Sequence, residues 1–74
     1  MGTTLREDLK QLVANRDKAG LQEIKDAFEK TRDSVAAIME AENDQGVYDL
    51  HKRLKINQIK NNIALVDAAL NRLP

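Results

Sequence analysis

Residues 56–73 read INQIKNNIALVDAALNRL, and the large aliphatic side chains of this stretch recur at alternating steps of three and four. On a helix of about 3.6 residues per turn, such steps place the side chains in one narrow apolar stripe, a pattern typical of coiled coils. A stripe of this kind is stable only against a partner surface. We therefore expect a helix whose core seam consists of Ile56, Ile59, Ile63, Val66, Leu70 and Leu73.

The composition indicates one small domain without covalent or metal reinforcement. The 74 residues include no Cys, so neither a disulfide nor a thiolate zinc site can support the fold. A chain of this size buries only about 60% of the surface that it exposes when unfolded. Association is the remaining way to gain buried area, so we expect the protein to bind itself, as an oligomer, or another protein.

Three helices are predicted, over about residues 4–15, 18–42 and 45–73. The segment Thr4-Leu5-Arg6-Glu7 matches a capping box, in which Thr4 and Glu7 satisfy backbone donors at a helix start. Two boundaries stay open. The first helix could continue to Ala19 with Gly20 as its stop, and the second could break at residues 31–33. The polar segment 42–46 is the clearest turn.

The third predicted helix has two apolar faces, which is typical of a helix that contacts two neighbours. At 100° per residue, Tyr48 falls with the core seam, while Val47, Leu50 and Leu54 lie roughly opposite it. In an antiparallel arrangement, the first helix reaches back only to about residues 56–70. It can then shelter Leu65, Ala64 and Ala68 but cannot reach the apolar residues nearer the turn. We expect a partner-binding surface at Val47, Leu50, Leu54 and Met39.

Residue types that carry catalysis or metal binding are sparse. His51 is the only His and Ser34 the only Ser, which disfavours a catalytic triad and a histidine metal site. The glycines form no phosphate-binding pattern, and the acidic turn lacks the ligand spacing of a calcium loop. We expect no enzymatic activity, no cofactor and no metal.

The charges balance at 12 basic and 12 acidic residues but are unevenly distributed. Residues 1–49 carry a net charge of −4, whereas residues 50–74 carry +4, with most of the excess in residues 51–60. That cluster permits electrostatic binding of nucleic acid. A solvated helix face is the competing interpretation, because Asp49 can pair with Arg53 one turn away.

Targeting signals are not evident in the sequence. No positively charged start leads into an apolar run, and the longest such run, residues 35–39, is far shorter than a membrane span. We expect no signal peptide, no membrane insertion and, given the lack of Cys, a cytoplasmic location.

A family resemblance adds to this interpretation. A short helical stretch from Thr3-Thr4-Leu5 onward precedes a charged helix that ends in a polar turn. Tyr48 follows the turn and leads a helix rich in Ile, Leu and Ala, as in Ile63-Ala64-Leu65-Val66. In these features, in length and in the lack of Cys, the chain resembles the small helical-hairpin co-chaperones of bacterial type III secretion needle assembly. The resemblance implies a cytoplasmic protein that binds a helical-repeat chaperone, so that the pair prevents premature polymerisation of a needle subunit.

Together, these observations predict an all-α protein, an antiparallel helical hairpin or three-helix bundle with a short N-terminal helix and two long helices. We expect it to act as a small protein–protein interaction module. The alternative is a self-associating structural or regulatory helical protein, with nucleic-acid binding through residues 51–60 as a further option.

Overall fold

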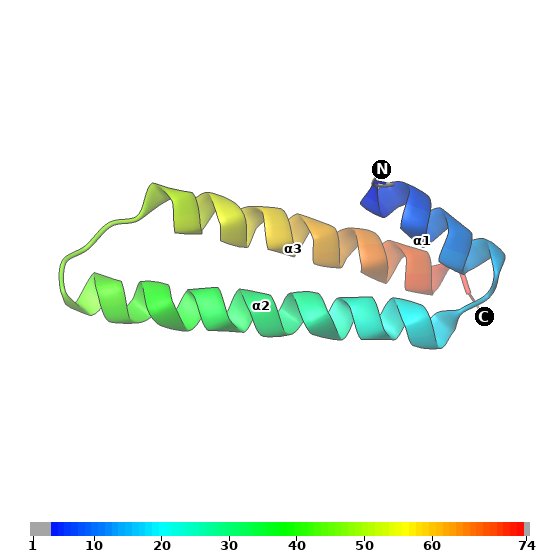
Figure 1. Ribbon diagram of the computed structural model, residues 1–74, viewed down its shortest axis with the longest axis horizontal. Helices are drawn as coiled ribbons and strands as arrows, with labels where there is room; N and C mark the ends of the chain where they lie inside the picture. The colour runs from blue at the N-terminus through cyan, green and yellow to red at the C-terminus, as the bar shows by residue number, and fades with distance from the viewer. Residues whose placement is uncertain (1–3, 74) are drawn as a thin grey trace.

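The computed structural model describes residues 4–73, which form three helices and no strand. Helix α1 spans Leu5–Ala14, α2 spans Lys18–Asp44 and α3 spans Leu50–Asn71. The two long helices form an antiparallel hairpin, and α1 folds back beside the C-terminal half of α3 (Figure 1). This arrangement confirms the predicted all-α hairpin. Of the residues quoted for the family resemblance, Thr3 lies outside the described range.

Each helix begins at a side chain that caps the backbone. Thr4 Oγ1 accepts a hydrogen bond from the Glu7 N–H at 3.3 Å, as the capping box predicts. Asp17 Oδ1 accepts from the Gly20 N–H at 2.9 Å. The capping residue Asp17 separates α1 from α2, so the alternative in which Gly20 stops the first helix is wrong. Helix α2 continues through residues 31–33 without a break.

The first two helices end in Schellman motifs, in which a left-handed residue lets two backbone N–H groups close the last turn. After α1, that residue is Arg16, with φ of 54°, and the Asp17 N–H donates to the Leu12 carbonyl at 2.9 Å. After α2, it is Gly46, with φ of 77°, and the Val47 N–H donates to the Glu42 carbonyl at 2.8 Å. Both turns are therefore fixed by backbone hydrogen bonds.

Helix α3 begins at Leu50 rather than near residue 45. The Schellman motif of α2 extends to Val47, and Asp49 then caps the new helix by accepting from the Lys52 N–H at 3.2 Å. Val47 and Tyr48 thus belong to the loop. The placement of Tyr48 on the core seam is wrong, because its backbone is not helical and its side chain is 67% exposed.

The buried core lies at the end of the hairpin where α1 packs, called here the α1 end. Leu21 of α2 and Val66 of α3 are both fully buried, and Leu9 of α1 packs into the same cluster. Along the core seam, the middle three residues are buried and the outer three are half-buried. The buried residues are Leu9, Leu21, Ile59, Ile63, Val66 and Ala69.

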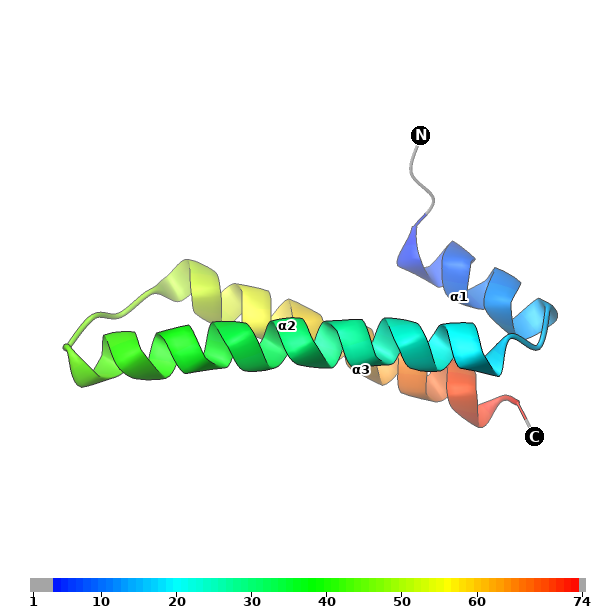
Figure 2. The same ribbon diagram turned by 60° about the horizontal axis from the view of Figure 1, so that its bottom comes forward.

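Helix α1 contacts both long helices and lies beside the same end of the hairpin in a second view (Figure 2). Leu65 is half-buried against the core cluster, as expected, but Ala64 and Ala68 are exposed. The prediction that α1 shelters these two alanines is wrong. Because α1 packs toward the line where α2 meets α3, it covers Ala69 and leaves the outer face of α3 open.

Candidate protein-binding surface

Large apolar side chains are exposed at the opposite end of the hairpin, around the α2–α3 loop. Leu50 and Leu54, one turn apart on α3, are 53% and 57% exposed. Val47 is also exposed, and Met39 of α2 is half-buried. These four residues are the ones that sequence reasoning assigned to a partner. We call the whole set the loop-end surface: Ile38, Met39, Val47, Tyr48, Leu50 and Leu54.

Ile38 of α2 stands three residues after Val35, a spacing typical of an inward-facing apolar stripe, but its side chain is 50% exposed. The heptad spacing of the core seam explains why. Seven residues before Ile59 and Ile56 stand Lys52 and Asp49, so the seam becomes polar near the loop. The apolar face of α2 therefore extends beyond the apolar face of α3. Sequence inspection could have found this mismatch by extending the heptad one step further.

The polar end of the seam is closed by an ionic cluster. Lys52 Nζ lies 2.7 Å from Glu42 Oε1, at the end of α2, and donates to Asp49 Oδ2 at 2.8 Å. The hydrogen bond from Lys52 lowers the pKa of Asp49, and the two carboxylates raise the pKa of Lys52. The first turn of α3 is thus tied to α2 by charge, without a buried apolar layer beneath it.

A groove of about 580 Å³ runs between α2 and α3 beside this cluster. Apolar side chains from both helices contribute to it, together with the cations Arg32, Arg53 and Lys60. We call it the basic groove. Its lining is Arg32, Ala36, Met39, Tyr48, Leu50, Arg53, Leu54, Ile56, Asn57 and Lys60.

Arg53 is held differently from the expectation that it pairs with Asp49. Its guanidinium carbon lies 4.6 Å from the centre of the Tyr48 ring, a cation–π arrangement. Asp49 instead serves Lys52, as both cap and ion-pair partner. The pairing prediction is wrong because Asp49 is the N-cap, whose side chain turns toward the first helical turn. Arg53 keeps its charge directed toward the groove.

The basic residues of the run 51–60 do not all face the same surroundings. Lys52 is neutralised by its two carboxylates, whereas Arg53 and Lys60 line the basic groove. The signal that sequence reasoning missed is Arg32, a cation from α2 that faces the same groove.

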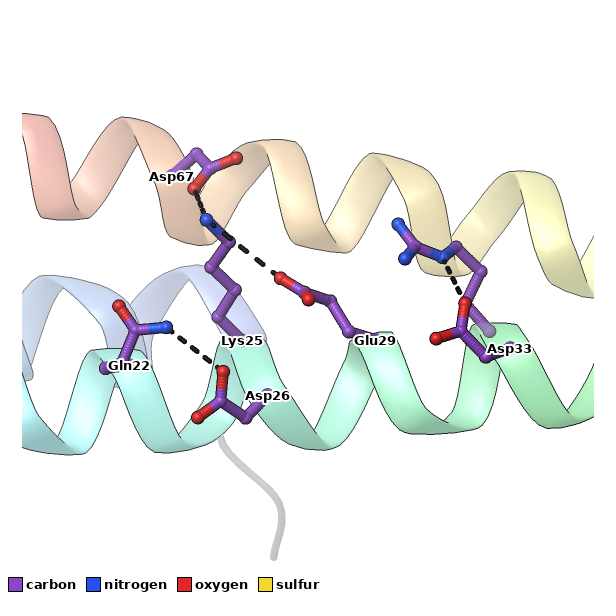
Figure 3. A network of polar contacts seen from close by, with 7 residues as sticks. Gln22, Lys25, Asp26, Glu29, Asp33 and Asp67 are labelled. Atoms are coloured by element: carbon purple, nitrogen blue, oxygen red, sulfur yellow. Dashed lines mark hydrogen bonds and ion pairs between the residues drawn. The ribbon is translucent and has the colours of Figure 1, made fainter.

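Oppositely charged residues join the two helices farther from the loop. Lys25 Nζ of α2 reaches across to Asp67 Oδ1 of α3 at 2.6 Å, and Glu29 approaches the same ammonium at 4.0 Å (Figure 3). The hydrogen bond to Asp67 raises the pKa of Lys25. The ion pair lies on the flank of the hairpin that also carries Arg32 and Lys60, since Arg32 follows Lys25 by seven residues and Lys60 precedes Asp67 by seven.

A second hollow, of about 310 Å³, lies between α1 and α3. Its lining includes the buried core residues Leu9 and Ala69, so it is the outer edge of the packed α1 end. Residues 4–73 contain no cluster of three or more metal-binding side chains. Among these same residues, no helix combines the length and apolar character needed to cross a bilayer. The loop-end surface and the basic groove are the places where exposed apolar side chains and cations of the described residues lie together.

Comparison with known proteins adds no assignment. No family model matches the chain, and neither the curated proteins nor the solved structures include a match to it.

Proposed function

We propose that this protein is a small, non-catalytic interaction module that binds an apolar helix of another protein at its loop-end surface. The observation that carries the proposal is the separation of two kinds of apolar residue. The buried core is confined to the α1 end, whereas five large apolar side chains are exposed around the α2–α3 loop. Met39, Tyr48, Leu50 and Leu54 of this surface line one groove. Exposed apolar clusters of this kind mark interaction sites in soluble proteins.

The local construction supports docking without rearrangement of the fold. The first turn of α3 is positioned by the Asp49 cap and by the Glu42–Lys52 ion pair. Leu50 and Leu54 therefore keep their positions without contributing to the buried core. A partner can cover them while the core around Val66 stays intact.

The family resemblance supports a narrower form of the proposal. In that form, the protein is a cytoplasmic type III secretion co-chaperone, and the partner is a helical-repeat chaperone that it binds and stabilises. The resemblance to that family rests on the helical hairpin, its polar turn and the Tyr48 that follows the turn. The lack of Cys is compatible with a reducing compartment.

Self-association is the competing function, because the loop-end surfaces of two copies could cover each other. Sedimentation velocity over a range of concentrations separates the two cases. A stable dimer that is lost when Leu50 and Leu54 are changed to Asp would favour self-association. A concentration-independent monomer would favour a foreign partner.

The proposal is tested by affinity capture from cells that express the protein, using three immobilised forms. These are the wild type, the double variant Leu50→Asp with Leu54→Asp, and a matched control, Gln58→Asp with Asn61→Asp. The control adds the same charge to exposed positions of the same helix, outside the basic groove. A specific partner should be retained by the wild type and the control and lost by the Leu50/Leu54 variant. Equal capture by all three forms would contradict the proposal.

A further inference from the structure

On the flank of the hairpin that carries the basic groove, one pair of facing residues has opposite charges, whereas the pair one heptad away has like charges. Lys25 of α2 and Asp67 of α3 pair across this flank at 2.6 Å. In an antiparallel hairpin, seven residues forward on one helix face seven residues back on the other. The next pair along the flank is therefore Arg32 and Lys60, and both line the basic groove.

Two cations on facing walls of a groove repel each other, so this pair adds no stability to the hairpin as the Lys25–Asp67 pair can. Asp33 accepts from Arg32 Nε at 3.2 Å, but its own side chain is 71% exposed and is not part of the groove lining. Arg53, stacked on Tyr48, adds a third cation. No carboxylate is among the lining residues within the part of the chain that the structure describes. Apart from the exposed ion pair between Arg32 and Asp33, these cations have no carboxylate beside them in the groove, so its lining carries a net positive charge.

Between these cations, the groove is lined by apolar side chains. Ala36 and Met39 come from α2, and Ile56 and Leu54 from α3. An amphipathic helix binds such a groove through apolar residues at steps of three and four, and the residues beside that stripe lie against the rims. We propose, building on the function proposed above, that the basic groove binds an amphipathic helix of a partner protein with carboxylates on both edges of its apolar stripe.

The observations favour a foreign helix over a second copy of this chain. The exposed face of α2 is acidic, with Asp26, Asp33 and Glu40 at seven-residue steps. The other residues on this face of α2 are Lys30 and Ala37. The face therefore presents charged groups but no large apolar side chain that could cover the groove of a second copy. Nucleic acid is also disfavoured, because a phosphate backbone would leave the apolar lining uncovered.

The proposal is tested by selecting binders to the immobilised full-length protein from a displayed library of helical peptides. The apolar positions vary among Leu, Ile, Met and Phe, and the two flanking rows vary among Glu, Gln and Lys. Selected peptides should be enriched in Glu over Lys in both rows. A synthetic binder with Glu flanks should bind about tenfold more tightly than its Gln-flanked counterpart, since each exposed ion pair contributes modestly. That advantage should shrink at about 0.5 M salt.

Arg32→Glu separates a recognition role from a structural one. This substitution restores an opposite-charge pair with Lys60 across the groove, like the pair formed by Lys25 and Asp67. It should leave the urea midpoint unchanged or raise it, while removing most of the preference for Glu flanks. Lys30→Glu, with the same charge change on the exposed face of α2, should keep the preference.

The outcomes distinguish this inference from the proposed function. Binders that require Leu50 and Leu54 but show no preference at the flanks would overturn the inference and leave the function standing. Failure to select any binder that depends on Leu50 and Leu54 would overturn both. A duplex DNA of about 20 base pairs that binds as tightly, and survives Leu50→Asp with Leu54→Asp, would identify a nucleic-acid surface and overturn the inference as well.

Discussion

The α1 end and the loop end of the hairpin use the same two helices but hold them together in different ways. At the α1 end, a third helix completes a core in which Leu21 and Val66 are fully buried. At the loop end, α2 and α3 have no third helix (Figure 1), and the Glu42–Lys52 ion pair replaces an apolar layer. The difference shows that a small chain can concentrate its buried core in one region and leave large apolar side chains exposed in another.

The largest effect that separates the two ends is expected from matched truncations on α2. Leu21→Ala should lower the free energy of unfolding by about 2–5 kcal/mol, because it opens a cavity in the core. Ile63→Ala, in the middle of the core seam, should fall in the same range. Ile38→Ala should cost less than about 1 kcal/mol, since half of that side chain is already exposed. Urea unfolding followed by circular dichroism gives all three values, and similar losses at Leu21 and Ile38 would remove the contrast.

Introducing a glycine at the first turn and removing the glycine at the second should change the free energy of unfolding in opposite directions. Arg16 has a left-handed backbone with φ of 54°, a conformation that glycine adopts without strain. Arg16→Gly should therefore raise the free energy of unfolding by about 0.5–1 kcal/mol. Gly46→Ala should lower it by about 1 kcal/mol, because φ is 77° there, although no atom lies within 4 Å of an added Cβ. Thermal unfolding of the two variants would reveal the signs, and equal signs would contradict the assigned turns.

The smallest effect concerns the ionic cluster at the loop end. The folded-state pKa of Asp49 is lowered, chiefly by the hydrogen bond from Lys52, so its stabilising contribution is complete above the ordinary value of 3.8. That contribution is lost as the pH falls through the lowered pKa.

Between about pH 5 and pH 2, the wild type should therefore lose more stability than Asp49→Asn, which keeps a capping side chain but does not titrate. Urea midpoints measured across this interval would show the two curves converging toward acid. Parallel curves would mean that the Lys52 interaction does not contribute to stability.

Much of the fold follows from patterns that the sequence displays locally. The steps of three and four predict α3 and its inward face, and Thr4 with Glu7 predicts the start of α1. The apolar spacing predicts a start of α3 near residue 45, which is too early, because the Schellman turn and the Asp49 cap keep Val47 and Tyr48 out of the helix. The left-handed backbone of Arg16 could not be predicted from its residue type, because hydrogen bonds around the turn impose that conformation.

The candidate site was predictable only in part. The exposure of Leu50 and Leu54 follows from register, because a helix as short as α1 cannot reach them. The basic groove was not predicted, since it joins Arg32 of α2 to Arg53 and Lys60 of α3. Whether these three cations lie together depends on which flanks of α2 and α3 face the same side of the hairpin. The Lys25–Asp67 contact shows which residues of the two helices face each other.

The most direct test of the central claim compares a pair of charged substitutions at the loop end with a single charged substitution at the α1 end. Leu50→Asp with Leu54→Asp should keep its helical circular dichroism, and its free energy of unfolding in urea should change by less than about 0.5 kcal/mol. Leu9→Asp should unfold most of the protein, because it buries an unpaired charge beside Leu21 and Val66. Unfolding of the Leu50/Leu54 variant to a similar extent would place those leucines in the core and contradict the account.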